Sequence, residues 1–172
     1  MTRKISIAQI SLWLFVIMLG IETGAGLYET FVIVPLWAGA PPDSVLAFVR
    51  HNASNPQMAI DAGGRFWIFA TPTLGLLSLA TLLTSPRTHP AHRRWRVFAA
   101  GLVFLLVAFT FAWFVPNILF LQSKNVLTMP RDEIVSLTNR WVVLNYLRGF
   151  SALAALAAAL RALSLPAENV PE

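Results

Sequence analysis

Long runs without charge are the feature of this chain that most constrains its fold. Residues 5–21, 66–86 and 97–123 contain no Asp, Glu, Lys or Arg, and residues 149–160 add a shorter fourth run. A helix needs about 20 predominantly apolar residues to cross the hydrocarbon core of a bilayer. The runs therefore predict an all-α integral membrane protein, a bundle of four helices that cross the bilayer up and down.

The composition agrees with lipid as the surroundings. Of the 172 residues, 56% are hydrophobic and 12% are charged, whereas about 25% are charged in a typical soluble domain. The net charge of +5 does not indicate nucleic acid, because Lys and Arg lie at the ends of the apolar runs, where membrane proteins carry them. The chain has no Cys, which excludes disulfides and Cys-ligated metal sites. We therefore expect membrane lipid as a partner and no nucleic acid.

Turn residues divide the chain into its expected elements. We predict one domain over residues 1–163 and a flexible tail over residues 164–172. Pro35 predicts the end of the first span, and Pro116 predicts a kink in the third. In the first loop, "PPDSVLAFVRHN" predicts a short amphipathic helix capped by Asp43 or Ser44. The predicted spans cover about residues 5–34, 66–85, 97–122 and 138–163.

The distribution of Lys and Arg predicts how the chain is threaded. Seven of these residues fall on the side of the two termini and the second loop, and four of the seven crowd between residues 87 and 96. The other side carries five, spread over two longer loops. Because loops rich in Lys and Arg stay in the cytoplasm, we expect a multi-pass protein of the cell inner membrane with both termini cytoplasmic. The first and third loops then face outward.

Ionisable residues interrupt the first and last spans. Glu22 and Glu29, in "IETGAGLYETF", are seven residues apart and so share one face of a helix. Arg140 and Arg148 lie in the fourth span. Charges inside a membrane are costly unless they are paired or hydrated. If the two helices are antiparallel, Glu29 lies level with Arg140 and Glu22 with Arg148, and we predict these two charge pairs.

The charge pairs allow two interpretations. They can simply lock the bundle together, or they can belong to an outward-facing polar pocket for a small hydrophobic molecule. Other polar residues at similar depth, and Asn117 beside Pro116, favour a pocket. No metal site is expected, since His51 and Glu29 lack a ligand spacing, and no cofactor is expected, since no intramembrane His is present for haem. The candidate residues are Glu22, Tyr28, Glu29, Asn117, Arg140, Asn145 and Arg148.

Several short motifs carry a family resemblance. "GAGLYETFVIVPLW" runs into "PPDSV" and is followed by "GRFW", "FVPNI" and "RWVVLNYLR". In this order they resemble a large set of uncharacterised bacterial four-helix membrane proteins, which are similar in turn to the small membrane proteins grouped with anthrone oxygenases. The resemblance extends from about residue 20 to residue 160. The matching positions are Tyr28, Glu29, Pro35, Trp37, Arg65, Trp67, Pro116, Arg140, Trp141, Asn145 and Arg148.

The resemblance implies oxidation of an aromatic substrate by oxygen, but it assigns no catalytic role to individual residues. Anthrone oxygenases are held to oxidise a tricyclic phenol with oxygen and without a metal or flavin. In such a reaction a base forms a substrate carbanion, and an Arg stabilises the resulting oxyanion. Two functions stay open at this point. One is a pocket protein, either a cofactor-independent oxygenase or a simple binder. The alternative is a non-enzymatic structural or accessory subunit of a membrane assembly, docked on another protein or on a second copy.

Overall fold

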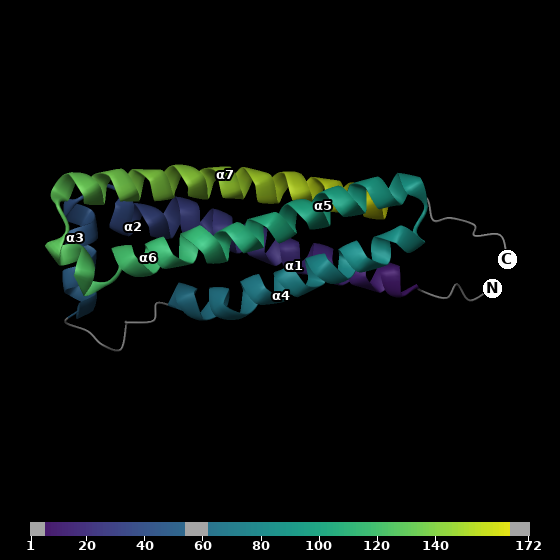
Figure 1. Ribbon diagram of the computed structural model, residues 1–172, viewed down its shortest axis with the longest axis horizontal. Coiled ribbons are helices and arrows are strands. Elements are labelled where there is room, and N and C mark those ends of the chain that lie inside the picture. Colours follow the sequence, from purple (N-terminus) through teal and green to yellow (C-terminus); the bar gives the residue numbers. More distant parts are fainter. Residues whose placement is uncertain (1–5, 54–61, 166–172) are drawn as a thin grey trace. The chain divides into compact units, whose positions relative to one another are not determined.

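The structure is a computed structural model that describes residues 6–53 and 62–165, and these residues are helical throughout apart from short turns. Within these two ranges, four helical stretches are long and apolar enough to cross a membrane: Ile7–Ala38, Gly64–Thr84, Pro90–Leu121 and Arg131–Ser164. The predicted all-α fold with four spans is confirmed (Figure 1). The predicted tail lies outside the described residues from residue 166 onward.

The elements follow one another in a simple order. In the first span they are α1 (Ile7–Tyr28), the π-helical turn η1 (Glu29–Ile33) and α2 (Val34–Ala38), and the first loop carries α3 (Asp43–Ala53). The second span is α4 (Ala62–Thr84), followed by the short 3₁₀ helix η3 (Ser85–Arg87). The third span comprises α5 (Pro90–Phe109), the π-helical turn η4 (Thr110–Phe114) and α6 (Val115–Leu121), and the fourth is α7 (Arg131–Ser164), preceded by the 3₁₀ helix η5 (Lys124–Thr128).

Pro35 and Pro116 each lie inside a helical stretch just after a π-helical turn, whereas Pro72 lies within the α-helix α4. The first span continues through Pro35 to Ala38, beyond the end that this proline predicts. In η1 the N–H of Val34 donates to the carbonyl of Glu29, five residues back. In η4 the N–H of Val115 donates in the same way to Thr110. Because proline has no N–H and crowds the carbonyl four residues before it, the wider turn lets each helix pass its proline without ending.

The chain forms two compact units, each built from segments of the four spans. Unit 1 comprises residues 1–23, 70–107 and 151–172, and unit 2 comprises residues 24–69 and 108–150.

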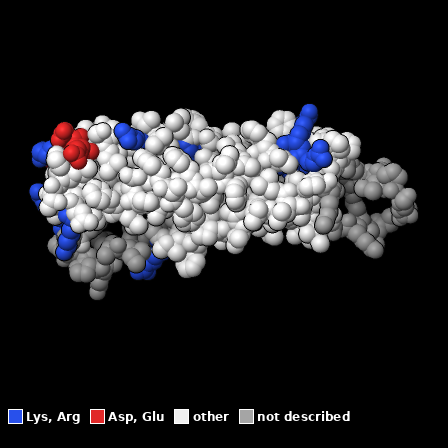
Figure 2. Space-filling view, viewed as in Figure 1, with Lys and Arg blue, Asp and Glu red and all other residues white. Residues whose placement is uncertain are grey.

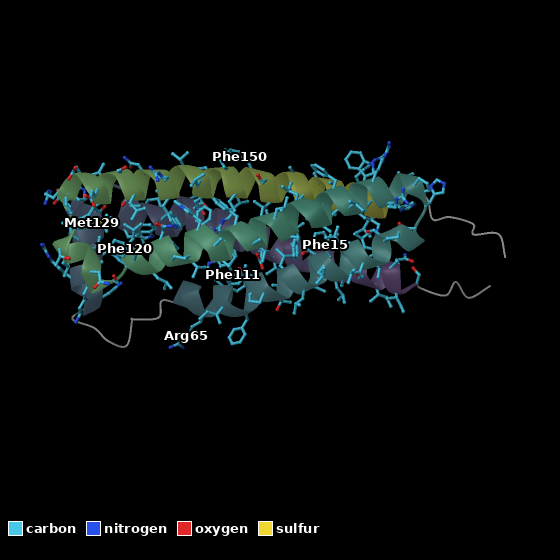
Figure 3. The ribbon with its side chains drawn as sticks, in the orientation of Figure 1. Phe15, Arg65, Phe111, Phe120, Met129 and Phe150 are labelled. Carbon is cyan, nitrogen blue, oxygen red and sulfur yellow. The ribbon has the colours of Figure 1, made fainter. Side chains whose placement is uncertain are left out.

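Unit 1 has an apolar core to which α1, α4, α5 and α7 all contribute. Small side chains predominate on α5 and α7, which lets helix backbones approach closely. Phe15 lies inside this core, whereas Phe150 of unit 2 stands on the outer surface of α7 (Figure 3). The buried core residues are Leu12, Phe15, Val16, Leu19, Leu74, Ala99, Ala100, Val103, Ala155, Ala158, Ala159 and Ala162.

Polar contacts at one end of unit 1 join the ends of its helices. Ser11 and Thr81 share a buried hydrogen bond of 3.0 Å. Arg96, only 3% exposed, donates to the carbonyl of Ala8 at 2.7 Å. A ring nitrogen of His92 lies 3.1 Å from the carbonyl of Ala162. The beginning of α1, the end of α4, the beginning of α5 and the end of α7 therefore meet at this end, so consecutive helices run antiparallel.

In unit 2, α3 packs its apolar face on the neighbouring helices. Val45, Leu46 and Val49 are buried in the core, whereas Asp43 and Arg50 are exposed. The predicted amphipathic helix is thus confirmed. The other buried core residues of unit 2 are Val34, Trp37, Phe114, Leu121, Val126, Ile134 and Trp141.

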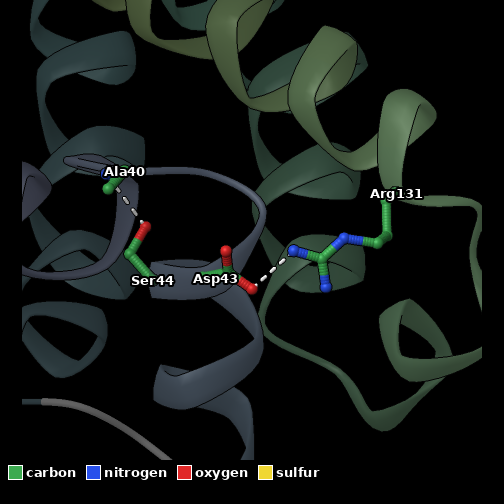
Figure 4. Close-up of polar contacts among 4 residues, drawn as sticks. All are labelled: Ala40, Asp43, Ser44 and Arg131. Atoms are coloured by element: carbon green, nitrogen blue, oxygen red, sulfur yellow. Dashed lines mark hydrogen bonds and ion pairs between the residues drawn. The ribbon is translucent and has the colours of Figure 1, made fainter.

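The beginning of α3 is held by two polar contacts (Figure 4). Ser44 Oγ accepts a hydrogen bond from the N–H of Ala40 at 3.2 Å, and Arg131 donates to the Asp43 carboxylate at 2.6 Å. Ser44 thus satisfies a backbone donor at the helix start, while Asp43 pairs with α7. Asp132 and Glu133 lie in the first turn of α7, where they complement the helix dipole. Figure 2 shows acidic side chains gathered over this part of unit 2, beside a largely uncharged helical surface.

Candidate functional site

The side chain of Arg148, on α7 in unit 2, lies against aromatic rings. Its Cζ atom is 4.8 Å from the centroid of the Phe114 ring and 5.8 Å from that of Trp67. One guanidinium nitrogen donates to Asn145 Oδ1 at 2.8 Å. A planar guanidinium stacks on aromatic faces and gains electrostatic energy there, more so away from water. Arg148 is therefore fixed by an amide on its own helix and by rings from two others.

Asn145 connects Arg148 to the first span. It is 2% exposed, and its Nδ2 donates to the hydroxyl of Thr30 at 2.9 Å. The orientation of this amide follows from its partners, because a guanidinium can only donate and so requires the carbonyl side of the amide. Thr30, Asn145 and Arg148 thus form a directional chain of hydrogen bonds across unit 2.

The two π-helical turns position two of these residues. Thr30 is the second residue of η1, and Phe114 is the last residue of η4. Both side chains are buried. A π-helical turn inserts one extra residue into a helix, which changes the face that the following side chains occupy, and such turns are frequent at functional sites. The prolines that follow them therefore help to set the geometry around Arg148.

An aromatic cluster is in contact with Arg148 through Phe114. The Phe114 ring meets Trp141 edge to face, with centroids 5.6 Å apart, and Trp141 meets Trp37 in the same manner at 5.2 Å. Phe109 adds a third edge-to-face contact to Phe114 at 5.5 Å. Each such pair contributes about 0.5–1.5 kcal/mol beyond area burial. The cluster gives the candidate site a rigid apolar wall.

Two polar atoms in the same region have no hydrogen-bond partner among the described residues. They are Nε1 of Trp141 and Oγ1 of Thr138. Trp141 is 3% exposed and Thr138 is 0% exposed, so neither atom reaches water. Buried polar groups are normally hydrogen-bonded, and each exception calls for an explanation.

The structure brings two of the predicted candidates into direct contact. Asn145 and Arg148 are in direct contact. Tyr28 is 59% exposed, Arg140 is exposed on α7, and Asn117 of α6 donates to the carbonyl of Trp113 in η4 at 2.6 Å.

The two predicted charge pairs remain predictions. Glu22 belongs to unit 1 and Glu29 to η1 of unit 2. In the part of the chain that the structure describes, no three His, Cys, Asp or Glu residues group as ligands of a metal ion would.

Thr30, Phe114 and Thr138 were not among the residues that the sequence singled out. One signal could have found Thr138, because positions 138, 141, 145 and 148 recur at intervals of three and four and share one face of a helix. Thr30 and Phe114 have no such signal. Their burial depends on the π-helical turns, which no spacing of apolar residues reveals.

Fold and site together define the class of this protein: a multi-pass helical membrane protein in which a partly buried Arg148 continues a buried Asn145–Thr30 hydrogen bond against an aromatic wall. The model of a known family, described as anthrone oxygenase, matches residues 64–158, more than half of the chain. The chain belongs to the anthrone oxygenase family, and the resemblance carried by its motifs is confirmed. The match includes Asn145 and Arg148 but not Thr30. No curated protein and no solved structure matches the chain.

Proposed function

We propose that the aromatic wall and Arg148 form an outward-facing pocket for a small planar hydrophobic molecule, and that the protein oxidises this molecule with oxygen without a cofactor. One observation carries the proposal: a guanidinium is held over Phe114 and beside Trp67 by a buried amide. Such an arrangement suits a flat aromatic molecule with an oxygen that becomes negatively charged, because the rings bind its face and the guanidinium binds the oxygen.

The family name supplies a reaction for which this arrangement is suitable. In an anthrone, a base removes a proton from the methylene carbon, and the negative charge that results is shared with the ketone oxygen. Arg148 stabilises this charge before and during the transition state, an effect that is stronger where water is excluded. Oxygen then takes up the electrons, so that the methylene carbon becomes a carbonyl and one molecule of water leaves. Anthrone and O₂ are thus converted into anthraquinone and water.

The base in this proposal is a carboxylate of the first span. Glu29 directly precedes Thr30 in η1, which makes it the acidic residue closest in sequence to the Thr30–Asn145–Arg148 chain. Glu29 is partly buried, and a carboxylate is a suitable general base when its geometry allows contact with the substrate.

The test uses the full chain in detergent micelles, with anthrone and dissolved oxygen as substrates. Oxygen uptake and the absorbance of anthraquinone are followed for the unaltered protein, for Arg148→Gln and for Arg50→Gln as a matched control. Arg50 is an exposed arginine on α3. We expect Arg148→Gln to lower kcat/KM by about 10²–10³, the usual effect of removing one donor to a developing oxyanion, and the control to leave it unchanged. Absence of oxygen uptake by the unaltered protein contradicts the oxygenase proposal.

A second function is supported by the same hydrogen bonds. The Thr30–Asn145–Arg148 chain joins η1 to α7, so it can serve mainly to hold unit 2 together in a structural or accessory subunit. In that case Arg148→Gln lowers the melting temperature strongly, and neither anthrone nor anthraquinone binds to the unaltered protein. Binding of either probe with a dependence on Arg148 favours the pocket.

A further inference from the structure

We infer that exposed arginines at the end of unit 1 that carries the second loop bind the anionic headgroup of a membrane phospholipid. The surface consists of Arg93 and Arg94 near the beginning of α5 and Arg161 in the last turn of α7, with Trp95 beside them. All three arginines are exposed, and Trp95 is half-buried. This surface belongs to unit 1, whereas the candidate site belongs to unit 2.

The beginning of α5 and the end of α7 are in contact. A ring nitrogen of His92 lies 3.1 Å from the carbonyl of Ala162. Arg93 and Arg94 follow His92 directly, and Arg161 directly precedes Ala162. The three arginines therefore belong to adjoining helix segments. Figure 2 shows basic side chains gathered on this end of the surface, with no acidic side chain among them on the face in view.

The positive charge of this surface is not neutralised in the part of unit 1 that the structure describes. The only acidic residue there is Glu22, about 22 Å along the helix axis from the beginning of α1. The beginning of a helix also disfavours Arg93 and Arg94, because the helix dipole is positive there. The first turns of α3 and α7 carry acidic residues instead. An anion from outside the chain would compensate this charge.

Apolar side chains continue from the arginines along the same helix faces. Phe98 is four positions after Arg94, and Ala157 is four positions before Arg161, so each pair shares one face of its helix. Both apolar side chains are exposed. Because α5 begins and α7 ends here, both lie farther from the helix ends than the arginines do. A phosphate joined to acyl chains matches this order of charge and apolar surface, whereas a soluble anion matches the charge alone.

Arg94 and Trp95 have the chemistry of the boundary between membrane and water. The Cζ atom of Arg94 lies 5.6 Å from the centroid of the Trp95 ring, where the ring attracts a cation. Tryptophan concentrates at the level of lipid headgroups. A guanidinium can donate two parallel hydrogen bonds to one phosphate, and anionic lipids attract basic residues near the membrane surface. The surface thus fits a negatively charged phospholipid headgroup.

The test compares probes that differ in headgroup charge and in acyl chains. The full chain in micelles of a nonionic detergent is titrated with phosphatidylglycerol, with phosphatidylcholine, or with glycerol 3-phosphate as a phosphate without acyl chains. The melting temperature is measured at each concentration, relative to that of the same variant without a probe. Arg94→Gln and Arg161→Gln are examined singly and together. Arg50→Gln, which removes an exposed arginine from α3 in unit 2, is the matched control.

We expect phosphatidylglycerol to raise the melting temperature, because a ligand that binds only the folded chain stabilises it. The other two probes should not raise it at equal concentration. Each single variant should need about fivefold more phosphatidylglycerol for half of the full rise, and the double variant about 25-fold more, since each arginine near an anionic surface contributes about 1 kcal/mol. The control should respond as the unaltered protein does, and salt should weaken the response.

Three contrary outcomes would overturn the inference. An equal rise with phosphatidylcholine would show that acyl chains alone stabilise the chain. An equal rise with glycerol 3-phosphate would show a site for soluble phosphates in place of a lipid site. An unchanged response of the double variant, or an equal loss in Arg50→Gln, would show that Arg94 and Arg161 do not form a headgroup site.

Discussion

At the scale of single residues, Asn145 is the side chain on which the candidate site depends most. It is buried, donates to Thr30 and accepts from Arg148. An amide is the only uncharged side-chain group that offers both a carbonyl acceptor and an N–H donor in this arrangement. The sequence indicated Asn145 and Arg148 because polar residues in an apolar span stand out. It did not indicate Thr30 or Phe114, because threonine and phenylalanine are ordinary residues of membrane helices.

We expect Asn145→Leu to lower the free energy of unfolding by about 2–3 kcal/mol, because the buried hydroxyl of Thr30 loses its donor and Arg148 loses an acceptor. Thermal and denaturant unfolding in detergent measure this change. Adding Thr30→Val should recover part of the loss, since it removes one of the groups left without a partner. A neutral effect of Asn145→Leu alone would show that the hydrogen bonds do not stabilise unit 2.

The hydrogen bond between Ser11 and Thr81 provides a comparison in unit 1, away from the candidate site. Ser11→Ala and Thr81→Val each remove one partner, and a double-mutant cycle isolates their coupling. We expect a coupling of about 0.6 kcal/mol, the average measured between polar side chains of membrane helices. Anthrone oxidation should be unaffected by either change, and a coupling near zero would contradict the role of this bond in helix packing.

At the scale of elements, the sequence predicted the membrane spans. It did not predict the π-helical turns by which two spans continue past a proline. Charge-free runs predict spans because lipid leaves few alternatives to a helix. A proline, however, predicts a helix end or a kink by the loss of its N–H. In this protein the π-helical turns η1 and η4 precede Pro35 and Pro116, and helical structure continues beyond both prolines. A π-helical turn depends on tertiary packing, so a local pattern does not distinguish it from a break.

Pro116→Ala tests whether η4 serves the site. The substitution supplies an N–H and removes the clash with the carbonyl four residues earlier, so the segment is free to return to an α-helix. That change would rotate Phe114 away from Arg148. We expect a higher melting temperature together with a loss of anthrone binding, and the opposite signs of the two effects separate this outcome from simple unfolding. A variant that keeps full affinity would show that the turn does not set the position of Phe114.

Packing between α4 and α5 in unit 1 depends on Gly75. A Cβ at this position would lie 3.1 Å from Cγ1 of Val107, whereas a Cβ at Gly101 would meet nothing within 4 Å. We expect Gly75→Ala to lower the free energy of unfolding by about 1 kcal/mol through overpacking. We expect Gly101→Ala to leave it unchanged or to raise it by about 0.5–1 kcal/mol, because alanine loses less conformational entropy on folding than glycine does. Unfolding in detergent compares the two. Val107→Ala should relieve the cost at Gly75, and equal effects at both glycines would contradict the steric reason.

At the scale of the whole molecule, the distribution of Lys and Arg predicts which side of the membrane each loop faces. The contacts of unit 1 place the beginning of α1, the end of α7 and the second loop at one end of that unit. Four spans require the two termini to share a side. The clustered arginines between residues 87 and 96 predict that this side is the cytoplasm. The candidate pocket would then open outward, as the proposed function requires.

Single cysteines test this arrangement directly, since the chain has none of its own. His89 in the second loop, Asn125 in the third and Ser164 at the end of α7 are exposed, and replacing them leaves the Lys and Arg count unchanged. We expect a membrane-impermeant maleimide to label Asn125→Cys in intact cells but His89→Cys and Ser164→Cys only after permeabilisation, because Lys- and Arg-rich segments are retained in the cytoplasm. The reverse pattern would place the arginines outside and turn the pocket toward the cytoplasm. Labelling of His89→Cys and Ser164→Cys from different sides would contradict an even number of spans.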